Sequence, residues 1–406
     1  MAETLRPDTP QQVLEAVQWA LSAGAPLDIQ GAGSKRGLGR PTHAAHVLDT
    51  SGLNGVSLYE PEELVLTAGA GTAMTEIEGL LSQNRQQLAF EPADLGEFYG
   101  GAPGRQTVGG VLAANLSGPR RLKAGAARDH FLGFKAVTGR GEEVKSGGRV
   151  VKNVTGYDLC KLLAGSHGTL AVMTEVTLKV LPAPEKSWTV LLFGLDETAA
   201  VSALAAAGCS PHEVASLAHL PRAVAARSSV AYVRDAGVSV TAIRVEGPGP
   251  SVEHRTAALK AQFTDAAELE ELHSHNTAAF WREIRDVAAL LPDAERALWK
   301  LSVTPTEAPT VLRTIRDGSD AEAYFDWAGG LLWLAVPARD DAAADLVRAA
   351  VGERGHATLM RAPDIVRAAV PVFQPQSESL AALGRRLREA FDPERILNRG
   401  RLVAED

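Results

Sequence analysis

The stretch from Thr107 to Pro182 constrains the fold of this chain more than any other, because it combines dense glycine with a long strand pattern. Twelve of the chain's 38 glycines lie within it. Glycine is costly inside helices and is favoured where the backbone must turn tightly or approach a ligand closely. From Leu170 to Val180, apolar residues repeat with the period of two that is typical of a β-strand. We therefore expect ligand-contacting loops that lead into a strand.

Composition indicates a globular protein with more than one domain. The chain has 406 residues, 45% hydrophobic and 22% charged, with a formal net charge of −8. This charge argues against a nucleic-acid partner, which requires a basic face. Two cysteines, Cys160 and Cys209, are too few for an iron–sulfur cluster and indicate no disulfide framework. No signal peptide and no membrane-spanning run is recognisable, so we expect a cytoplasmic protein.

The N-terminal region predicts a helix, a short strand and a glycine-rich loop. Thr9 as N-cap and Pro10 in the first turn begin a helix that should end near Gly24. The strand PLDIQ then leads directly into GAGSKRGLGRP, residues 31–41. A strand at LVLTAGAGT and a helix from Ala73 are expected before the glycine-dense stretch.

The loop at residues 31–41 matches no standard nucleotide motif. A Rossmann fingerprint needs G-x-G-x-x-G opening a helix, whereas here the third glycine comes one residue late and Gly39 and Pro41 prevent a helix. Successive backbone N–H groups in such a loop can still form an anion-binding nest. Ser34 and Lys35 would add a hydroxyl and a charge. An ordinary flexible turn is the alternative.

Beyond Pro182 the pattern predicts an α+β domain with helices on one face of an antiparallel sheet. Helical stretches are expected near 196–208, 252–272 and 340–351, and a last helix should carry Leu380, Leu383, Leu387 and Phe391 on one face. The expected strands are WTVLLFGL, SVAYVRD, VTAIRVEG, LWKLSVT, AYFDWAG and LLWLAVP.

A series of motifs along the chain is similar to that of one flavoprotein family. The series is GAGSKRGLGRP, EPEELVLTAGAGT, TVGGVLAANLSGPRRLKAGAARDHFLGF, GGRVVKNVTGYDLCKLLAGSHGTLAVMTEVTLKVLP, FWREIRD, LWKLSV, FDWAGGLLWL, GHATLMRAP and FDPERILNRGRL. It resembles the FAD-binding E subunits of bacterial glycolate oxidase (glycolate dehydrogenase), within the vanillyl-alcohol oxidase and para-cresol methylhydroxylase superfamily. The resemblance runs from about residue 10 to the C-terminus. GSHGTLAV is shared across the superfamily, whereas SGPRR, KNVTGYD, FDWAGG and GHAT in series are more specific.

The resemblance implies an α+β fold with a two-subdomain FAD-binding domain of the vanillyl-alcohol oxidase type and an α+β cap domain. The FAD-binding domain would comprise residues 1–182 and the cap, for substrate or partner, residues 185–372. Residues 373–406 would form a helix and tail that return to the FAD-binding domain. Some members of the superfamily attach FAD through a histidine in the first loop. Here Ser34 and Lys35 occupy that region and the nearest imidazole is His43, so non-covalent FAD is expected.

The resemblance also implies cofactor contacts. The pyrophosphate loop would be Gly31, Ala32, Gly33, Ser34 and Lys35; the flavin-side loop Thr107, Gly109, Gly110 and Ser117; and the segment along ribose and adenine Gly165, Gly168, Thr169 and Val172. Three departures from the family pattern occur: Ala171 replaces the usual glycine, GAPGRQTVGG is a longer turn, and Arg399 replaces a common proline.

The catalytic residues are not identified by these motifs. Oxidation of a 2-hydroxy acid needs a base for the hydroxyl proton and a cation for the carboxylate, yet the GDGN-x-H motif of the related D subunit is absent. The candidates are Arg282, Lys300 and His356, with surface or structural roles as the alternative. The HSH sequence at 273–275 lacks a third ligand at recognisable spacing, so no metal site is expected.

Three functional hypotheses follow from the resemblance. The favoured one is an FAD-binding subunit of a multi-subunit glycolate oxidase that converts glycolate to glyoxylate and carries flavin for redox or electron relay. Its partners would be a larger FAD-binding catalytic subunit and an iron–sulfur subunit, through which any contact with the inner membrane would be made. The alternatives are a self-sufficient FAD-dependent 2-hydroxy acid dehydrogenase and a non-redox, FAD-stabilised scaffold subunit.

Overall fold

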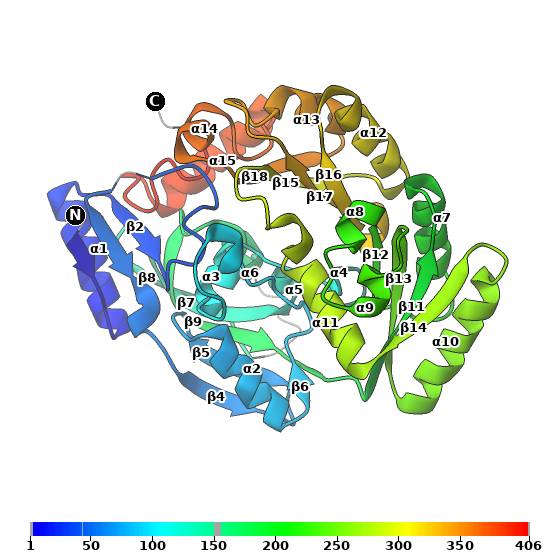
Figure 1. The fold of residues 1–406 in the computed structure, drawn as a ribbon. Coiled ribbons are helices and arrows are strands. Elements are labelled where there is room, and N and C mark those ends of the chain that lie inside the picture. The colour runs from blue at the N-terminus through cyan, green and yellow to red at the C-terminus, as the bar shows by residue number, and fades with distance from the viewer. Residues whose placement is uncertain (1–2, 43, 150–155, 405–406) are drawn as a thin grey trace. The chain divides into compact units, whose positions relative to one another are not determined.

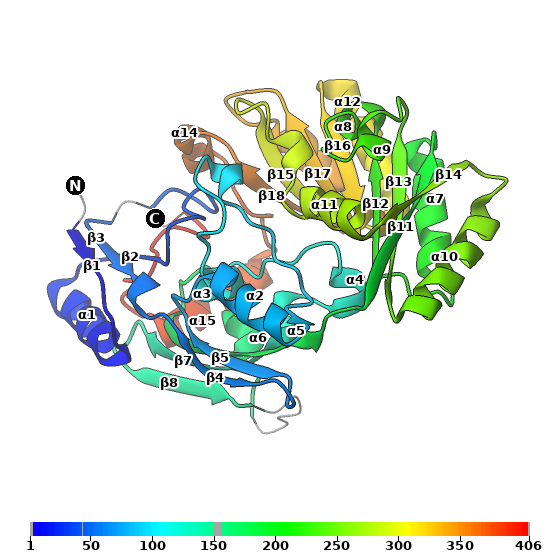
Figure 2. The same ribbon diagram turned by 60° about the horizontal axis from the view of Figure 1, so that its bottom comes forward.

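The structure is a computed structural model that describes residues 3–42, 44–149 and 156–404 (Figures 1 and 2). His43 and residues 152–155 of the KNVTGYD motif lie outside the described residues. The chain divides into two compact units, each of which mixes helices and strands, so the predicted α+β class is confirmed. Unit 1 comprises Met1–Ser117, Gly125–Ala183 and Pro375–Asp406, and unit 2 comprises Gly118–Ala124 and Pro184–Gln374.

Unit 1 contains two main sheets. The first is parallel with the order β1-β3-β2, and the second is antiparallel with the order β4-β5-β9-β7-β8. The strands are β1 (Glu3–Leu5), β2 (Leu27–Gln30), β3 (His46–Asp49), β4 (Val56–Glu60), β5 (Val65–Gly69), β7 (Phe131–Thr138), β8 (Glu143–Gly147) and β9 (Ala171–Lys179), with a small pair β6 (Gln86–Gln87) and β10 (Leu181–Pro182).

The first helix of unit 1, α1 (Pro10–Ala23), forms as predicted. The Thr9 side chain accepts a hydrogen bond from the backbone N–H of Gln12, and Gly24 ends the helix with φ +60°. The apolar face of α1 packs into one hydrophobic core with β2, β3 and the C-terminal segment that follows α15 (Glu378–Phe391). Residues near both ends of the chain therefore share one core.

The predicted strand at the end of the glycine-dense stretch is β9. It contacts α1 and also α3 (Val108–Ala113), and its residues are almost all buried. Its buried threonines are hydrogen-bonded: Thr174 Oγ1 donates to the Lys135 carbonyl oxygen at 3.1 Å, and Thr177 Oγ1 lies 2.9 Å from Thr67 Oγ1. The other helices of unit 1 are α2 (Met74–Gln83), α5 (Ala127–His130) and α6 (Leu159–Leu163).

Unit 2 is built on one antiparallel sheet with the strand order β14-β11-β13-β12-β16-β17-β15-β18. The strands are β11 (Lys186–Phe193), β12 (Ser216–Leu220), β13 (Val240–Gly247), β14 (Glu268–His273), β15 (Ala297–Ser302), β16 (Glu322–Asp326), β17 (Leu331–Val336) and β18 (His356–Arg361). The predicted cap, residues 185–372, lies within unit 2, and its role in binding substrate or partner stays a prediction.

The two faces of this sheet are covered differently (Figure 2). On one face, α7 (Glu197–Gly208), α10 (Gly249–Phe263), α12 (Ala308–Gly318) and α13 (Ala344–Val351) form two hydrophobic cores. Val190 belongs to these cores, so its neighbour Thr189 points to the other face. There the Trp281 Nε1 of α11 (Ser274–Arg285) donates to Thr189 Oγ1 at 2.8 Å. We call this second face the α11 face.

Three predictions for unit 2 are wrong. Helices were expected on one face of the sheet, but α11 packs on the other because Thr277, Phe280, Trp281 and Ile284 give it an apolar side of its own. SVAYVRD was expected as a strand, but Val230 and Val233 are buried at helical spacing and α9 (Ala231–Arg234) forms. Residues 268–272 were expected in a helix, but they form β14, since pairing with β11 decides the conformation.

The remaining helices of unit 2 are short. They are α4 (Arg121–Ala124), α8 (Arg222–Ala225) and α14 (Asp364–Ala369). The segment Gly118–Ala124, which contains α4, lies far from the rest of unit 2 in sequence and is part of it in space.

Candidate functional site

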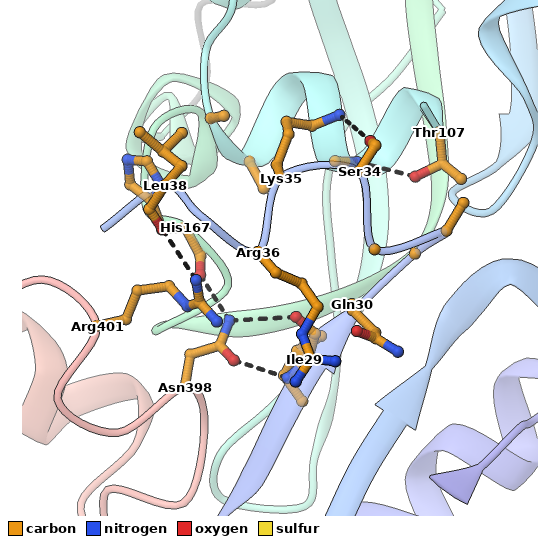
Figure 3. Close-up of a pocket in the computed structure, with 16 residues that line it drawn as sticks. Ile29, Gln30, Ser34, Lys35, Arg36, Leu38, Thr107, His167, Asn398 and Arg401 are labelled. Atoms are coloured by element: carbon orange, nitrogen blue, oxygen red, sulfur yellow. Dashed lines mark hydrogen bonds between the residues drawn. The ribbon is translucent and has the colours of Figure 1, made fainter. Parts of the chain in front are cut away.

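A cavity of about 90 Å³ in unit 1 lies between the loop that follows β2, the start of α3 and the C-terminal tail (Figure 3). All five residues of the predicted pyrophosphate loop line it, together with Thr107 and Gly110 of the predicted flavin-side loop. Two segments separated by about 70 residues in sequence are thus brought to one pocket. The role of this loop as an anion-binding nest stays a prediction.

The loop can approach α3 only because it lacks side chains at the closest point. A Cβ on Gly31 would lie 2.3 Å from Thr107 Oγ1, and Gly33 has a φ of +74°. Both positions therefore require glycine on steric grounds. Thr107 caps α3, and its Oγ1 accepts a hydrogen bond from the Gly110 N–H at 3.4 Å.

Lys35 is the lysine of this pocket, whose lining also includes Arg36 and Arg401. Its Nζ donates to Ser34 Oγ at 3.2 Å and to Gln106 Oε1 at 3.5 Å. Burial lowers the pKa of Lys35 to about 8, although the carboxylate of Asp94 acts to raise it. The ammonium is charged at neutral pH but poorly solvated, so an anionic ligand in the pocket would stabilise it.

Asn398 and Arg401 of the C-terminal tail also line the pocket. Asn398 Oδ1 accepts from the Ile29 N–H at 2.7 Å, and its Nδ2 donates to the His167 carbonyl oxygen at 2.7 Å. Arg401 donates to Asp28 Oδ1 at 2.8 Å and to the Leu38 carbonyl oxygen at 2.9 Å. These contacts, drawn in part in Figure 3, fix the tail against β2 and the loop that follows it.

Sequence reasoning missed Asn398, Arg401 and His167 as pocket residues. The motif RILNRGRL contains the first two, but no pattern within it assigns them to this loop. His167 has a positive φ of 53°, and its pKa is lowered to about 4 by burial and by the charge of Arg401. His167 is therefore neutral at physiological pH.

Six other predicted cofactor residues do not line this cavity, and their roles as cofactor contacts stay predictions. Gly109 permits a close approach, since a Cβ there would lie 2.8 Å from the Ala70 carbonyl oxygen. Ser117 Oγ accepts from the Ala127 N–H at 3.0 Å. The remaining four are Gly165 and Gly168, both with positive φ, Thr169, whose Oγ1 donates to the Ser166 carbonyl oxygen, and Val172, which lies in the core beside α1.

The three predicted catalytic candidates all lie in unit 2. Arg282 is exposed on α11, and His356 is exposed at the start of β18. Lys300 is half-buried on β15, with its Nζ 5.2 Å from the ring centroid of Trp327 and 5.9 Å from that of Trp333. The structure thus separates Lys300, which stands among aromatic rings, from two residues that face water.

The HSH sequence has a structural explanation. His273 stacks on Trp188 with ring centroids 4.1 Å apart, and its Nε2 lies 2.9 Å from Glu271 Oε2. Within residues 3–42, 44–149 and 156–404, no three His, Cys, Asp or Glu side chains are grouped as metal ligands. In the same ranges, no helix has the length and apolar character needed to cross a membrane.

The residues of the unit 1 pocket fit the diphosphate of a dinucleotide. The glycines at positions 31 and 33 leave the backbone N–H groups of the loop accessible, and Lys35 supplies a cation. The buried Gln30 Oε1 makes no hydrogen bond within the described part of the chain, which leaves an acceptor for a ligand donor.

Comparisons with known proteins identify the same region. The family model described as "FAD binding domain" matches residues 2–147. The chain is 34% identical over 399 residues to the glycolate oxidase subunit GlcE of Escherichia coli K12, covering 98% of each chain. It is 26% identical over 393 residues to the glycolate oxidase subunit GlcD of Bacillus subtilis, covering 90% of this chain and 81% of that one.

The similarity extends to solved structures. The 4-ethylphenol oxidase from Gulosibacter chungangensis in complex with isoeugenol aligns with a TM-score of 0.71 at 16% identity, covering 99% of this chain and 89% of that chain. An alkyldihydroxyacetonephosphate synthase aligns with a TM-score of 0.67 at 19% identity, covering 97% of this chain and 75% of that one. At such identities the likeness shows the fold alone, and the predicted vanillyl-alcohol oxidase type is confirmed.

Proposed function

The chain belongs to the family of FAD-binding glycolate oxidase E subunits, and from this premise we propose that it is the FAD-carrying E subunit of a multi-subunit glycolate oxidase. The reaction is the oxidation of glycolate to glyoxylate. The observation that carries the proposal is the pocket in which Gly31, Gly33 and Lys35 meet the start of α3.

The residues of unit 1 hold FAD in this proposal without a covalent bond. The backbone N–H groups of residues 31–35 bind the diphosphate, and the Lys35 ammonium neutralises part of its charge. Thr107, Gly109, Gly110 and Ser117 lie on the flavin side, and Gly165, Gly168, Thr169 and Val172 follow the ribose and adenine. When bound, FAD would supply a redox centre that accepts and passes on the electrons taken from the hydroxy acid.

The chain works with partners in this proposal. A larger FAD-binding subunit performs the substrate oxidation, because the GDGN-x-H motif of that subunit type is absent here. An iron–sulfur subunit carries electrons onward, because two cysteines are too few for a cluster on this chain. The assembly lies in the cytoplasm, and any contact with the inner membrane is made by these partners.

The anaerobic visible spectrum of the purified, FAD-loaded chain tests this function. With glycolate alone we expect the flavin absorption to stay unbleached, and we expect bleaching after the catalytic subunit is added. Bleaching by glycolate alone would contradict the relay role and would identify a self-sufficient dehydrogenase. A flavin that no condition reduces would identify a non-redox scaffold subunit.

A further inference from the structure

A loop of unit 1 that the proposed function does not use is closed by a single carboxylate. The loop comprises residues 94–104, and we call it the strap. Asp94 Oδ1 accepts a hydrogen bond from the Gly96 N–H at 2.9 Å, and Asp94 Oδ2 accepts one from the Gly104 N–H. One side chain therefore joins the two ends of the strap.

The strap is compact and anchored in unit 1. The Gly101 N–H donates to the Gly96 carbonyl oxygen at 2.9 Å, and a Cβ on Gly96 would lie 2.4 Å from the Ala102 carbonyl oxygen. The Phe98 side chain is buried, and its ring centroid lies 4.9 Å from that of Tyr99 in an edge-to-face arrangement. Such a loop is held by its own packing as well as by its ends.

The ring of Tyr99 lies against the loop at residues 31–41. A Cβ on Gly37 would lie 2.3 Å from Tyr99 Cδ1 and 2.6 Å from Tyr99 Cε1. A residue with a side chain at position 37 would therefore displace the ring. Leu38, the next residue, lines the pocket, so the strap contacts the loop that forms one wall of the pocket.

The far end of the strap leads into a second wall of the pocket. Gln106 follows Gly104 by two residues, and its Oε1 accepts the hydrogen bond from Lys35 Nζ at 3.5 Å. Thr107, the next residue, lines the pocket. Because two residues span at most about 7 Å, the hydrogen bond that holds Gly104 on Asp94 also restricts where Gln106 can lie.

The Asp94 carboxylate also acts on the lysine of the pocket. Burial lowers the pKa of Lys35 to about 8, and the charge of Asp94 acts to raise it. The other charged or titratable side chains around this part of the pocket are Arg36, Arg401, Asp28 and His167. The two arginines pair with the one carboxylate, and the imidazole is neutral at physiological pH because its pKa is about 4. Asp94 therefore favours the charged form of Lys35.

We propose that Asp94 is a positioning residue for the cofactor pocket: its carboxylate closes the strap, holds Tyr99 against Gly37 and keeps the Lys35 ammonium charged for an anionic ligand. Removing this one carboxylate should loosen the strap and discharge the lysine together. That the anion is the diphosphate of FAD rests on the proposed function, whereas the closed strap and its effect on Lys35 do not.

Heteronuclear NMR of labelled lysine side chains in the full chain without FAD tests the effect on charge, and Lys35→Met assigns the signal. We expect Lys35 Nζ to titrate near pH 8 in the wild type. In Asp94→Asn it should titrate about one pH unit lower, because the opposite charge is lost while the shape of the side chain is kept. The pH above which FAD affinity falls should drop by the same amount.

Asp196→Asn is the matched control for these titrations. Asp196 also accepts a backbone hydrogen bond, from the Ala199 N–H to its Oδ1 at 2.8 Å, but it lies in unit 2. This variant should leave both the lysine titration and the pH profile of FAD affinity unchanged.

Hydrogen exchange tests the strap itself. The amides of Gly96 and Gly104 should exchange about tenfold faster in Asp94→Asn, because a hydrogen bond to the carboxylate is lost. Tyr99→Ala separates the two effects, since it keeps the carboxylate and removes the ring from Gly37. In that variant FAD should dissociate faster, while Lys35 should titrate as in the wild type.

Three results would each overturn the role of Asp94. They are an unchanged lysine titration in Asp94→Asn, unchanged amide exchange in that variant, or a titration in Tyr99→Ala that shifts as far as in Asp94→Asn. If Asp94→Asn does not fold, Asp94→Ser, which removes the charge and keeps an acceptor oxygen, replaces it in both measurements. A chain that passes these tests but binds no FAD keeps this inference and loses the proposed function.

Discussion

The two units surround a buried lysine in different ways. In unit 1 the pocket is lined by the glycine-containing loop Gly31–Lys35, by the start of α3 and by the C-terminal tail. In unit 2, Lys300 of β15 and Arg121 of α4 lie beside the indole of Trp327, and Lys300 also lies near that of Trp333. Burial lowers the pKa values of Lys35 and Lys300 to about 8. The neighbours differ, because Lys35 has hydrogen-bond acceptors whereas Lys300 has a second cation beside it.

This difference decides what each unit can tolerate. A main-chain site depends on positions that lack a Cβ and on the segments that hold them in place. It should therefore be sensitive to substitution of its glycines and to loss of the contacts of the C-terminal tail. A side-chain site depends on a few charges and the pairs that orient them. The following variants separate these two kinds of dependence.

The largest effect is expected when the tail of unit 1 is released. Arg401→Met removes the buried partner of Asp28, whose side chain is 4% exposed, and should lower the free energy of unfolding by about 3–5 kcal/mol. Arg36→Met is the matched control, because Arg36 contacts the same carboxylate at 3.4 Å but is 61% exposed; it should cost less than about 1 kcal/mol. Denaturant unfolding measures both. Equal losses of unfolding free energy in the two variants would show that the Arg401–Asp28 ion pair does not hold the C-terminal tail in place.

A smaller loss is expected in unit 2 from Arg120→Met. Burial acts to raise the pKa of Glu246, but Arg244 and Arg120 outweigh it and lower the pKa to about 2. Arg120→Met should lower the free energy of unfolding by about 3 kcal/mol, and not by more, since Arg244 Nε remains 3.9 Å from Glu246 Oε1. The pair stabilises the fold above the ordinary carboxyl pKa, and this stability is lost as pH falls toward 2. Hydrogen exchange in β13 measures it.

Lys123→Met is the control for this prediction. Lys123 lies on the same short helix and pairs with Glu213 at 3.2 Å, but both side chains are exposed, at 48% and 68%. Its loss should change stability by less than about 0.5 kcal/mol. A loss of stability as large as that of Arg120→Met would mean that any change in α4 destabilises unit 2, and that the buried Glu246 carboxylate is not the cause.

Gly31→Ala should lower the free energy of unfolding by about 1–3 kcal/mol, because the new Cβ would lie 2.3 Å from Thr107 Oγ1. We expect weaker FAD binding together with the loss of stability. Adding Thr107→Ala should restore part of the FAD affinity and part of the stability, since it removes the atoms that clash with the new Cβ. The single Thr107→Ala variant should itself lose stability, because it removes the N-cap of α3. A double-mutant cycle measures this coupling. Strict additivity would show that Gly31 acts elsewhere.

The smallest effect concerns the pH dependence of FAD affinity. A bound diphosphate favours charged Lys35, so affinity should be constant below pH 8 and should fall by up to tenfold per pH unit above it. Arg36 and Arg401 line the same pocket, and the Asp94 carboxylate acts on Lys35. His167 stays neutral because its pKa is about 4. Lys35→Met should remove the pH dependence, and an unchanged profile in that variant would assign it to another group.

The sequence predicts the unit 1 pocket better than the grouping of Lys300 with its neighbours in unit 2, for a physical reason. The loop at residues 31–41 and the start of α3 are short-range patterns of glycine, a capping threonine and a lysine, which can be recognised locally. Arg121, Lys300, Trp327 and Trp333 are far apart in sequence, and only strand pairing brings them together. Asn398 and Arg401 were missed for the same reason. β14 was mistaken for helix because its edge pairing with β11 is not visible locally.

The most direct test of the central claim is the FAD content of the purified chain, measured for the wild type and for Gly33→Asp. A carboxylate at position 33 would repel the diphosphate and would have to adopt a φ of +74°. Gly24→Asp is the matched control, because Gly24 has a φ of +60° at the end of α1 and open space around it. We expect one FAD per chain in the wild type and in Gly24→Asp, and loss of FAD from folded Gly33→Asp. Equal FAD content in all three proteins would contradict the assignment of this loop.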